Sequence, residues 1–179
     1  MMFDVLMSAV EKMESKISSS LRKWLGIPPS FSNVGLYGGE TKLQLPFTAL
    51  TEEFKVTKTR MAITIQTSSD DCVRKAGVTL PTGRKWAVQG AVDEATSRLK
   101  HKDIVGKVCI GRQGLGFAEA GVHNRWDTAD CKERRKMVTD EVRNVEEEKR
   151  MARAVGMASQ GAWMKWESAV PRKITWKTL

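Results

Sequence analysis

The sequence is poor in cysteine and histidine, and neither residue falls into a disulfide or metal-binding pattern. Cys72, Cys109 and Cys131 are odd in number, widely spaced and without a CxxC pairing. This spacing argues against a disulfide scaffold and favours an intracellular location, nuclear or cytoplasmic. His101 and His123 lie far apart, and neither stands at zinc-finger spacing from a cysteine pair. We therefore expect no metal site, and no pattern indicates a cofactor.

Long hydrophobic runs and catalytic motifs are also missing. No stretch approaches the roughly 18 uncharged apolar residues that a bilayer span needs, so we expect no membrane partner. Asp4 and Glu11 break the apolar opening, which argues against a secretory signal. The glycine-rich segment 111–117, GRQGLGF, lacks the GK[ST] ending of a phosphate-binding loop. No carboxylate cluster or nucleophile context emerges, so a non-enzymatic protein is expected, with an enzyme of unrecognised site as a third alternative.

Positive charge is what the sequence has in excess. The 179 residues carry 30 Lys+Arg against 21 Asp+Glu, a formal charge of +9. Residues 51–100 hold 9 basic against 6 acidic side chains, and residues 151–179 hold 5 against 1. Such a surface attracts polyanions, of which nucleic acid is the commonest inside cells. The alternative is that the charge only keeps the protein soluble.

Apolar residues recur mostly at steps of three and four, which predicts a mainly α-helical chain. A first helix is expected over residues 3–25, ended by Gly26 and Pro28-Pro29. Alternating residues between Ser30 and Phe47 predict a small β-hairpin, with Val34–Tyr37 on one side of a Gly38-Gly39 turn. Further helices are expected after a Thr48 or Thr51 cap, as a short turn at 70–76 with Asp70-Asp71 in a capping or solvated role, around Val88–Leu99, and from Asp127 or Asp130 to about Ser168.

Glycines between Gly106 and Asn124 predict a flexible connector. The expected organisation is therefore a helical domain with the hairpin over 1–105, a Gly-rich connector over 106–126, and a long helix with a basic tail over 127–179. The mixed charges of 132–150, such as Glu146 with Arg150, are interpreted as a solvated helix face.

Several of the six tryptophans stand beside cations, as in Arg22-Lys23-Trp24 and Arg84-Lys85-Trp86. This arrangement suits phosphate contacts next to a base-stacking platform. Core packing is the competing interpretation, favoured for Trp24, Trp163 and Trp166 and left open for Trp86 and Trp126. Trp24, Phe54, Leu99 and Trp166 are expected to hold helices together, whereas the ammonium groups of Lys55 and Lys58 are expected to point outward.

One stretch resembles a known family. Residues 12–38, KMESKISSSLRKWLGIPPSFSNVGLYG, look like the segment after the palm in reverse transcriptases of non-LTR retrotransposons with restriction-type endonucleases. The basic-Trp-Leu-Gly-hydrophobic-Pro motif that begins the thumb there is similar to residues 22–28. The likeness continues through 43–46, 52–55, Arg60, 83–86, 160–163, 166–167 and 172–176.

The resemblance implies a thumb-like helical bundle and post-polymerase linker that grips a DNA or RNA–DNA duplex through its backbone. The palm's aromatic-Ala-Asp-Asp strand is absent from the sequence, so the resemblance carries over no catalytic residue. The expected function is a non-catalytic fragment of a retrotransposon reverse transcriptase polyprotein that binds nucleic-acid backbone. Its predicted contacts are Arg22, Lys23, Lys55, Lys58, Arg84, Lys85, Trp86, Arg172 and Lys173. The alternative function is a helical protein–protein interaction module that uses the helix beyond Asp127; the oligomeric state stays open.

Overall fold

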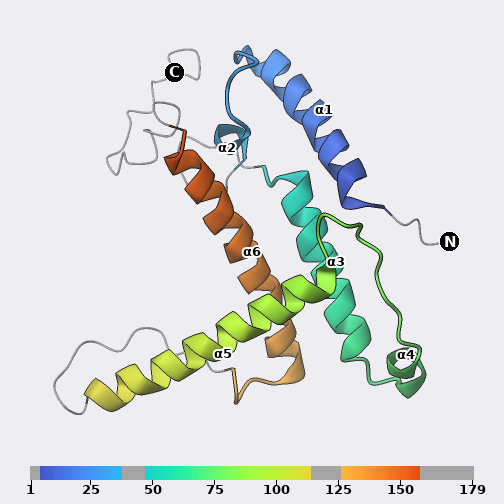
Figure 1. The fold of residues 1–179 in the computed structure, drawn as a ribbon, viewed down its shortest axis with the longest axis vertical. Helices are drawn as coiled ribbons and strands as arrows, with labels where there is room; N and C mark the ends of the chain where they lie inside the picture. Colours follow the sequence, from blue (N-terminus) through green and yellow to red (C-terminus); the bar gives the residue numbers. More distant parts are fainter. Residues whose placement is uncertain (1–4, 38–46, 114–125, 158–179) are drawn as a thin grey trace. The chain divides into compact units, whose positions relative to one another are not determined.

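The computed structural model describes residues 5–37, 47–113 and 126–157, and these residues are mainly helical. The chain divides into two compact units, a terminal unit of residues 1–54 and 145–179 and a central unit of residues 55–144. The six described helices, shown in Figure 1, are α1 Met7–Leu25, α2 Asn33–Leu36, α3 Leu50–Gln66, α4 Asp71–Lys75, α5 Val88–Gln113 and α6 Cys131–Val155. The mainly α-helical fold class is confirmed. The divisions between the units fall within α3 and within α6.

The terminal unit begins with α1, which ends where the sequence predicts. Gly26 adopts the left-handed conformation with φ 67°, and the Ile27 amide donates to the Arg22 carbonyl over 2.9 Å. This arrangement satisfies the last carbonyls of the helix, and glycine adopts it without steric cost. The terminal unit also contains a small apolar cluster, made of Ile27, Leu36, Tyr37 and Ala49.

The first strand of the predicted hairpin is wrong, because its residues form the short helix α2. The Ser32 hydroxyl caps this turn by accepting from the Val34 amide over 3.2 Å. Gly35 fits because a Cβ there would lie 2.5 Å from the Phe31 ring. A short apolar run does not by itself distinguish a strand from a buried helical turn, and here the cap and the ring contact decide it. Residues 38–46 of the predicted hairpin lie outside the described residues.

Charged side chains from α1 and α6 contact the start of α3 in the terminal unit. Glu14 of α1 accepts from the Thr51 backbone amide over 2.7 Å, so the contact at this helix start comes from a distant side chain rather than from the expected threonine cap. Glu52 pairs with Arg150 of α6 at 2.9 Å, and both side chains are nearly buried. Burial raises the pKa of Glu52 above its usual value, an effect that Glu146 reinforces and the Arg150 guanidinium opposes.

The central unit is built on a larger apolar cluster, taken from α3, α5, α6 and the turn before α6. Its buried members are Ala62, Ile63, Val88, Val92, Ala95, Leu99, Trp126, Val138 and Val142. The expected core role of Leu99 is confirmed. Trp126, which the sequence left open, belongs to this core, and Arg134 lies 5.5 Å from its ring.

Helix boundaries in the central unit follow local signals in two cases and depart from them in one. The short helix α4 is confirmed and is capped by Asp70, which accepts from the Cys72 amide over 2.8 Å. Asp130 and Glu133 form a reciprocal capping box at the start of α6, which agrees with the predicted start. The connector prediction is wrong over its first residues, because α5 continues through Gln113. Helical hydrogen bonding tolerates an internal glycine at a cost of only about 1 kcal/mol.

The mixed-charge helix α6 is more buried than expected. Glu141 and Glu146 are buried, so the segment is not simply a solvated face. Arg150, the expected partner of Glu146, bonds to Glu52, while Glu146 pairs with Lys149 at 3.3 Å. The helix ends at Val155 before Gly156; residues 158–168 of the predicted extension lie outside the described residues.

Candidate nucleic-acid interface

In the terminal unit, Arg22 performs a structural task. Its Nε donates to the Phe31 carbonyl over 2.9 Å, and its Nη2 contacts Asn33. The guanidinium therefore ties the end of α1 to α2. The neighbouring Lys23 is exposed, and so is Trp24, at 77 %. The expectation that Trp24 packs in the core is wrong, because the helical turn that aims Arg22 inward aims Trp24 at solvent.

Lys55 and Lys58 lie on the part of α3 that belongs to the central unit. Lys58 is only 8 % exposed and Lys55 is half-buried, and each takes part in an interaction within the chain. The predicted outward ammonium group of Lys58 is therefore wrong. Val56, Thr59 and Ile63 form one buried stripe on α3, and the burial of Lys58 and Ala62 widens the buried arc beyond it.

A cleft of about 520 Å³ lies in the central unit, between the end of α3, α4, the loop after α4 and the start of α5. Its walls include Ala62, Ile65, Gln66, Arg74, Val78, Leu80, Thr82, Gly83, Val88 and Gln89. The Gln66 and Gln89 side chains bond to each other over 2.6 Å. Gly77 and Gly83 have positive φ angles of 57° and 92°, which allow the loop to turn at each end of the cleft wall.

Exposed cations stand beside this cleft. Arg84 and Lys85 follow the cleft-lining Gly83, and Lys75 follows the cleft-lining Arg74; all four of these basic side chains are exposed. Arg74 pairs with Asp71 on α4, so part of its charge is neutralised. The Thr82 hydroxyl donates to the Trp86 carbonyl over 2.7 Å and holds the turn that carries Arg84 and Lys85.

The start of α5 adds to the positive field at this place. The first turn of α5 contains no acidic residue. The amino end of a long helix carries a partial positive charge and directs backbone amides outward, which favours anions such as phosphate. Arg84 and Lys85 precede this helix start by only a few residues.

Trp86 packs partly inside the central unit. It is half-buried and packs against the central apolar cluster. Trp86 therefore helps to anchor the turn that carries Arg84 and Lys85.

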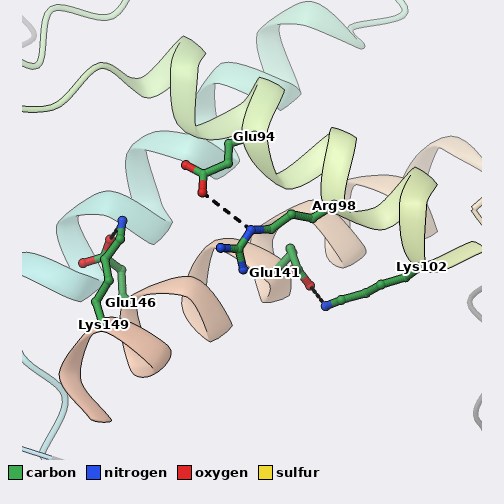
Figure 2. Close-up of polar contacts among 6 residues, drawn as sticks. All are labelled: Glu94, Arg98, Lys102, Glu141, Glu146 and Lys149. Atoms are coloured by element: carbon green, nitrogen blue, oxygen red, sulfur yellow. Dashed lines mark hydrogen bonds and ion pairs between the residues drawn. The ribbon is translucent and has the colours of Figure 1, made fainter. Parts of the chain in front are cut away.

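Other cations of the central unit are occupied by a buried carboxylate that the sequence analysis missed. Glu141 of α6 bonds to Lys102 of α5 at 2.6 Å and lies 3.9 Å from Arg98, which also pairs with Glu94 (Figure 2). Arg98 and Lys102 thus balance a carboxylate that is 2 % exposed. The i,i+4 spacing of the two cations was visible in the sequence, but nothing local indicates that Glu141 lies between them.

The structure therefore divides the predicted contacts into groups. Arg84 and Lys85 are exposed beside the cleft, and Lys23 is exposed in the terminal unit. Arg22 bonds to the Phe31 carbonyl, and Lys55, Lys58, Lys85 and Trp86 each take part in an interaction within the chain. Arg172 and Lys173 lie outside the described residues. Among the described residues, no group of three or more His, Cys, Asp or Glu side chains is placed to hold a metal ion.

No family model, no curated protein and no solved structure matches this chain. Within the described part of the chain, every helix is too short or too polar to cross a membrane.

Proposed function

We propose that the protein binds the phosphate backbone of nucleic acid through the cations beside the central cleft, without catalysing a reaction itself. The observation that carries the proposal is the pair Arg84 and Lys85, exposed on a fixed turn directly before the acid-free first turn of α5. Lys75 and Arg74 stand at the α4 side of the same cleft. Backbone binding needs such clustered, exposed cations and no base-reading side chains.

The resemblance to the thumb region of non-LTR reverse transcriptases supports a duplex, DNA or RNA–DNA, as the partner. Under this proposal the chain is a helical, non-catalytic fragment of a retroelement polyprotein. The rival function, a partner-binding helix beyond Asp127, has less support, because Val138 and Val142 of that helix are already packed in the central core.

Fluorescence anisotropy with labelled duplex DNA, RNA–DNA hybrid and single-stranded probes tests the proposal. If about four phosphates are contacted, affinity should fall roughly 100-fold between about 50 and 200 mM salt. Arg84→Ala with Lys85→Ala should weaken binding at least about tenfold and reduce the salt slope by about two.

The matched control removes two cations from the terminal unit, Lys12→Ala with Lys16→Ala, and so changes the net charge equally. This control should keep most of the affinity. Absence of binding at the lower salt, or equal losses in the two double variants, would contradict the proposal.

A further inference from the structure

We propose that α1 and the groove beside it form a docking surface for an amphipathic helix of a partner protein that carries acidic residues along one flank. This inference concerns the terminal unit and does not depend on nucleic-acid binding by the central unit. It begins with an apolar ridge, defined as Leu6, Met13, Ile17 and Trp24, all of which are exposed.

The ridge residues are aligned because of their spacing. Met13, Ile17 and Trp24 are separated by 4 and 7 residues, and with 3.6 residues per turn these steps place their side chains on one line along α1; Leu6, seven residues before Met13, is the N-cap residue at the start of this line. At 1.5 Å per residue the ridge is about 27 Å long. Single exposed apolar residues are ordinary, but an aligned row of them marks an interaction surface.

A groove lies on one side of the ridge. It has a volume of about 400 Å³, and its walls are Ile17, Leu21, Tyr37, Phe47, Thr48, Leu50 and Glu53. Phe47 is 50 % exposed, and Leu50 is exposed as well, so the groove is open to solvent. Helix-in-groove recognition uses this combination, in which side chains at i, i+3 or i+4 and i+7 of the guest enter an apolar trough.

The two sides of the surface have opposite charge. Lys12, Lys16 and Lys23 each directly precede a ridge residue, and all three are exposed, so they form a second row alongside the ridge. On the groove side the lining carboxylate is Glu53. A guest helix with acidic residues toward the lysine row meets complementary charge there, which steers association and fixes orientation.

This charge pattern also discriminates between occupants. A second copy of α1 would bring one lysine row toward another. The chain's own residues 158–179 carry Lys165, Arg172, Lys173 and Lys177 against Glu167, so their net charge has the sign of the row. An anionic lipid surface would meet the Glu53 carboxylate and leave the concave groove poorly filled. An acidic amphipathic helix satisfies both the apolar trough and the lysine row.

The test uses the full chain and two labelled, designed helical peptides of about 18 residues. Both peptides carry the same leucine face, one flanked by glutamates and the other by lysines. We expect the acidic peptide to bind at least about tenfold more tightly than the basic one in fluorescence anisotropy. Ile17→Glu should weaken its binding by at least about tenfold, and Trp24→Ser should also weaken it.

Ser15→Glu is the matched control, because it adds the same charge to an exposed position of α1 that faces nearly opposite to the ridge and lies off the line of the lysine row. It should leave binding within about threefold, and circular dichroism melting should show that all three variants fold. Absence of peptide binding, or equal binding of the two peptides, overturns the proposal. The proposal is also overturned if neither peptide binds but the protein binds anionic phosphatidylserine vesicles and Ile17→Glu abolishes that binding. The same holds if neither peptide binds but the protein self-associates in sedimentation and Ile17→Glu abolishes the self-association.

Discussion

The tripeptide Arg-Lys-Trp occurs in both units of this protein, at residues 22–24 and 84–86, with opposite outcomes. In the terminal unit the arginine is held by Phe31 and Asn33 and the tryptophan is 77 % exposed. In the central unit the arginine is exposed and the tryptophan is half-buried against the core. The same three residues therefore build an internal contact in one place and a cationic surface in the other.

The difference extends to the units as a whole. Among the described residues, the central unit buries a cluster of nine apolar side chains and displays cations beside its cleft. The terminal unit buries a cluster of four, uses Arg22 and Arg150 in internal contacts, and leaves the α1 ridge exposed. The contrast is one of degree, because Arg98 and Lys102 of the central unit also balance a buried carboxylate, and Lys12, Lys16 and Lys23 of the terminal unit are exposed.

The largest expected effect concerns the central core. Leu99→Ala removes a side chain that is 5 % exposed and should lower the free energy of unfolding by about 2–5 kcal/mol, because a cavity remains in a packed cluster. Urea denaturation followed by circular dichroism measures it. Ile104→Ala, on the same helix but 59 % exposed, is the control and should change stability by less than about 0.5 kcal/mol. Similar losses in the free energy of unfolding for both variants would contradict the conclusion that α5 buries the face that carries Leu99 and exposes the face that carries Ile104.

The next effect concerns a cation used internally. Arg150→Met leaves the nearly buried Glu52 without its guanidinium partner and should cost about 3 kcal/mol at neutral pH. Burial already raises the pKa of Glu52, and loss of Arg150 should raise that pKa further. Folding then favours the protonated carboxyl, so stability is retained below the unfolded pKa and falls as pH rises through the folded one.

Denaturation of the Arg150→Met variant from about pH 4 to pH 7 measures this dependence. Its deficit relative to the parent protein should shrink as the pH is lowered. The double variant with Glu52→Gln should lose most of the pH dependence. A deficit that stays constant over this range would mean that Arg150 acts through packing rather than through Glu52.

Local sequence signals predicted the elements whose ends are set by neighbouring residues. Gly26 ends α1, Asp70 caps α4 and Asp130 begins α6, as expected. Each of these signals works through hydrogen bonds between residues that are close in the sequence, so these helix ends can be predicted from the local sequence. The same reasoning placed Leu99 in the core from its helical spacing.

Contacts between distant residues explain the expectations that were wrong. The burial of Lys58 depends on what surrounds α3, whereas α2 is set by local contacts, the Ser32 cap and the Phe31 ring over Gly35, that its apolar pattern did not reveal. In the candidate interface, spacing identified Arg84 and Lys85 but gave no means of seeing that Arg22 is held by an internal carbonyl. Whether a cation faces solvent is decided by its tertiary neighbours, which a single sequence does not list.

A smaller effect compares the helix starts of the two units. Asp130→Ala removes a local capping box, and Glu14→Ala removes a carboxylate that reaches the start of α3 from α1. Each substitution should cost about 1 kcal/mol in urea denaturation. Glu14→Gln keeps an acceptor oxygen and should recover part of the loss. Full stability of Glu14→Ala would show that the distant carboxylate is dispensable for starting α3.

The smallest expected effect returns to the repeated tripeptide. Trp24→Ala should change the free energy of unfolding by less than about 0.5 kcal/mol, because its side chain is 77 % exposed and has little packing to lose. Trp86→Ala should cost more, since Trp86 packs against the central cluster. Thermal and urea denaturation of both variants give the comparison. A Trp24 variant that loses as much stability as the Trp86 variant would show that the ridge is covered within the folded chain, and the opposite fates of the two tripeptides would then no longer hold.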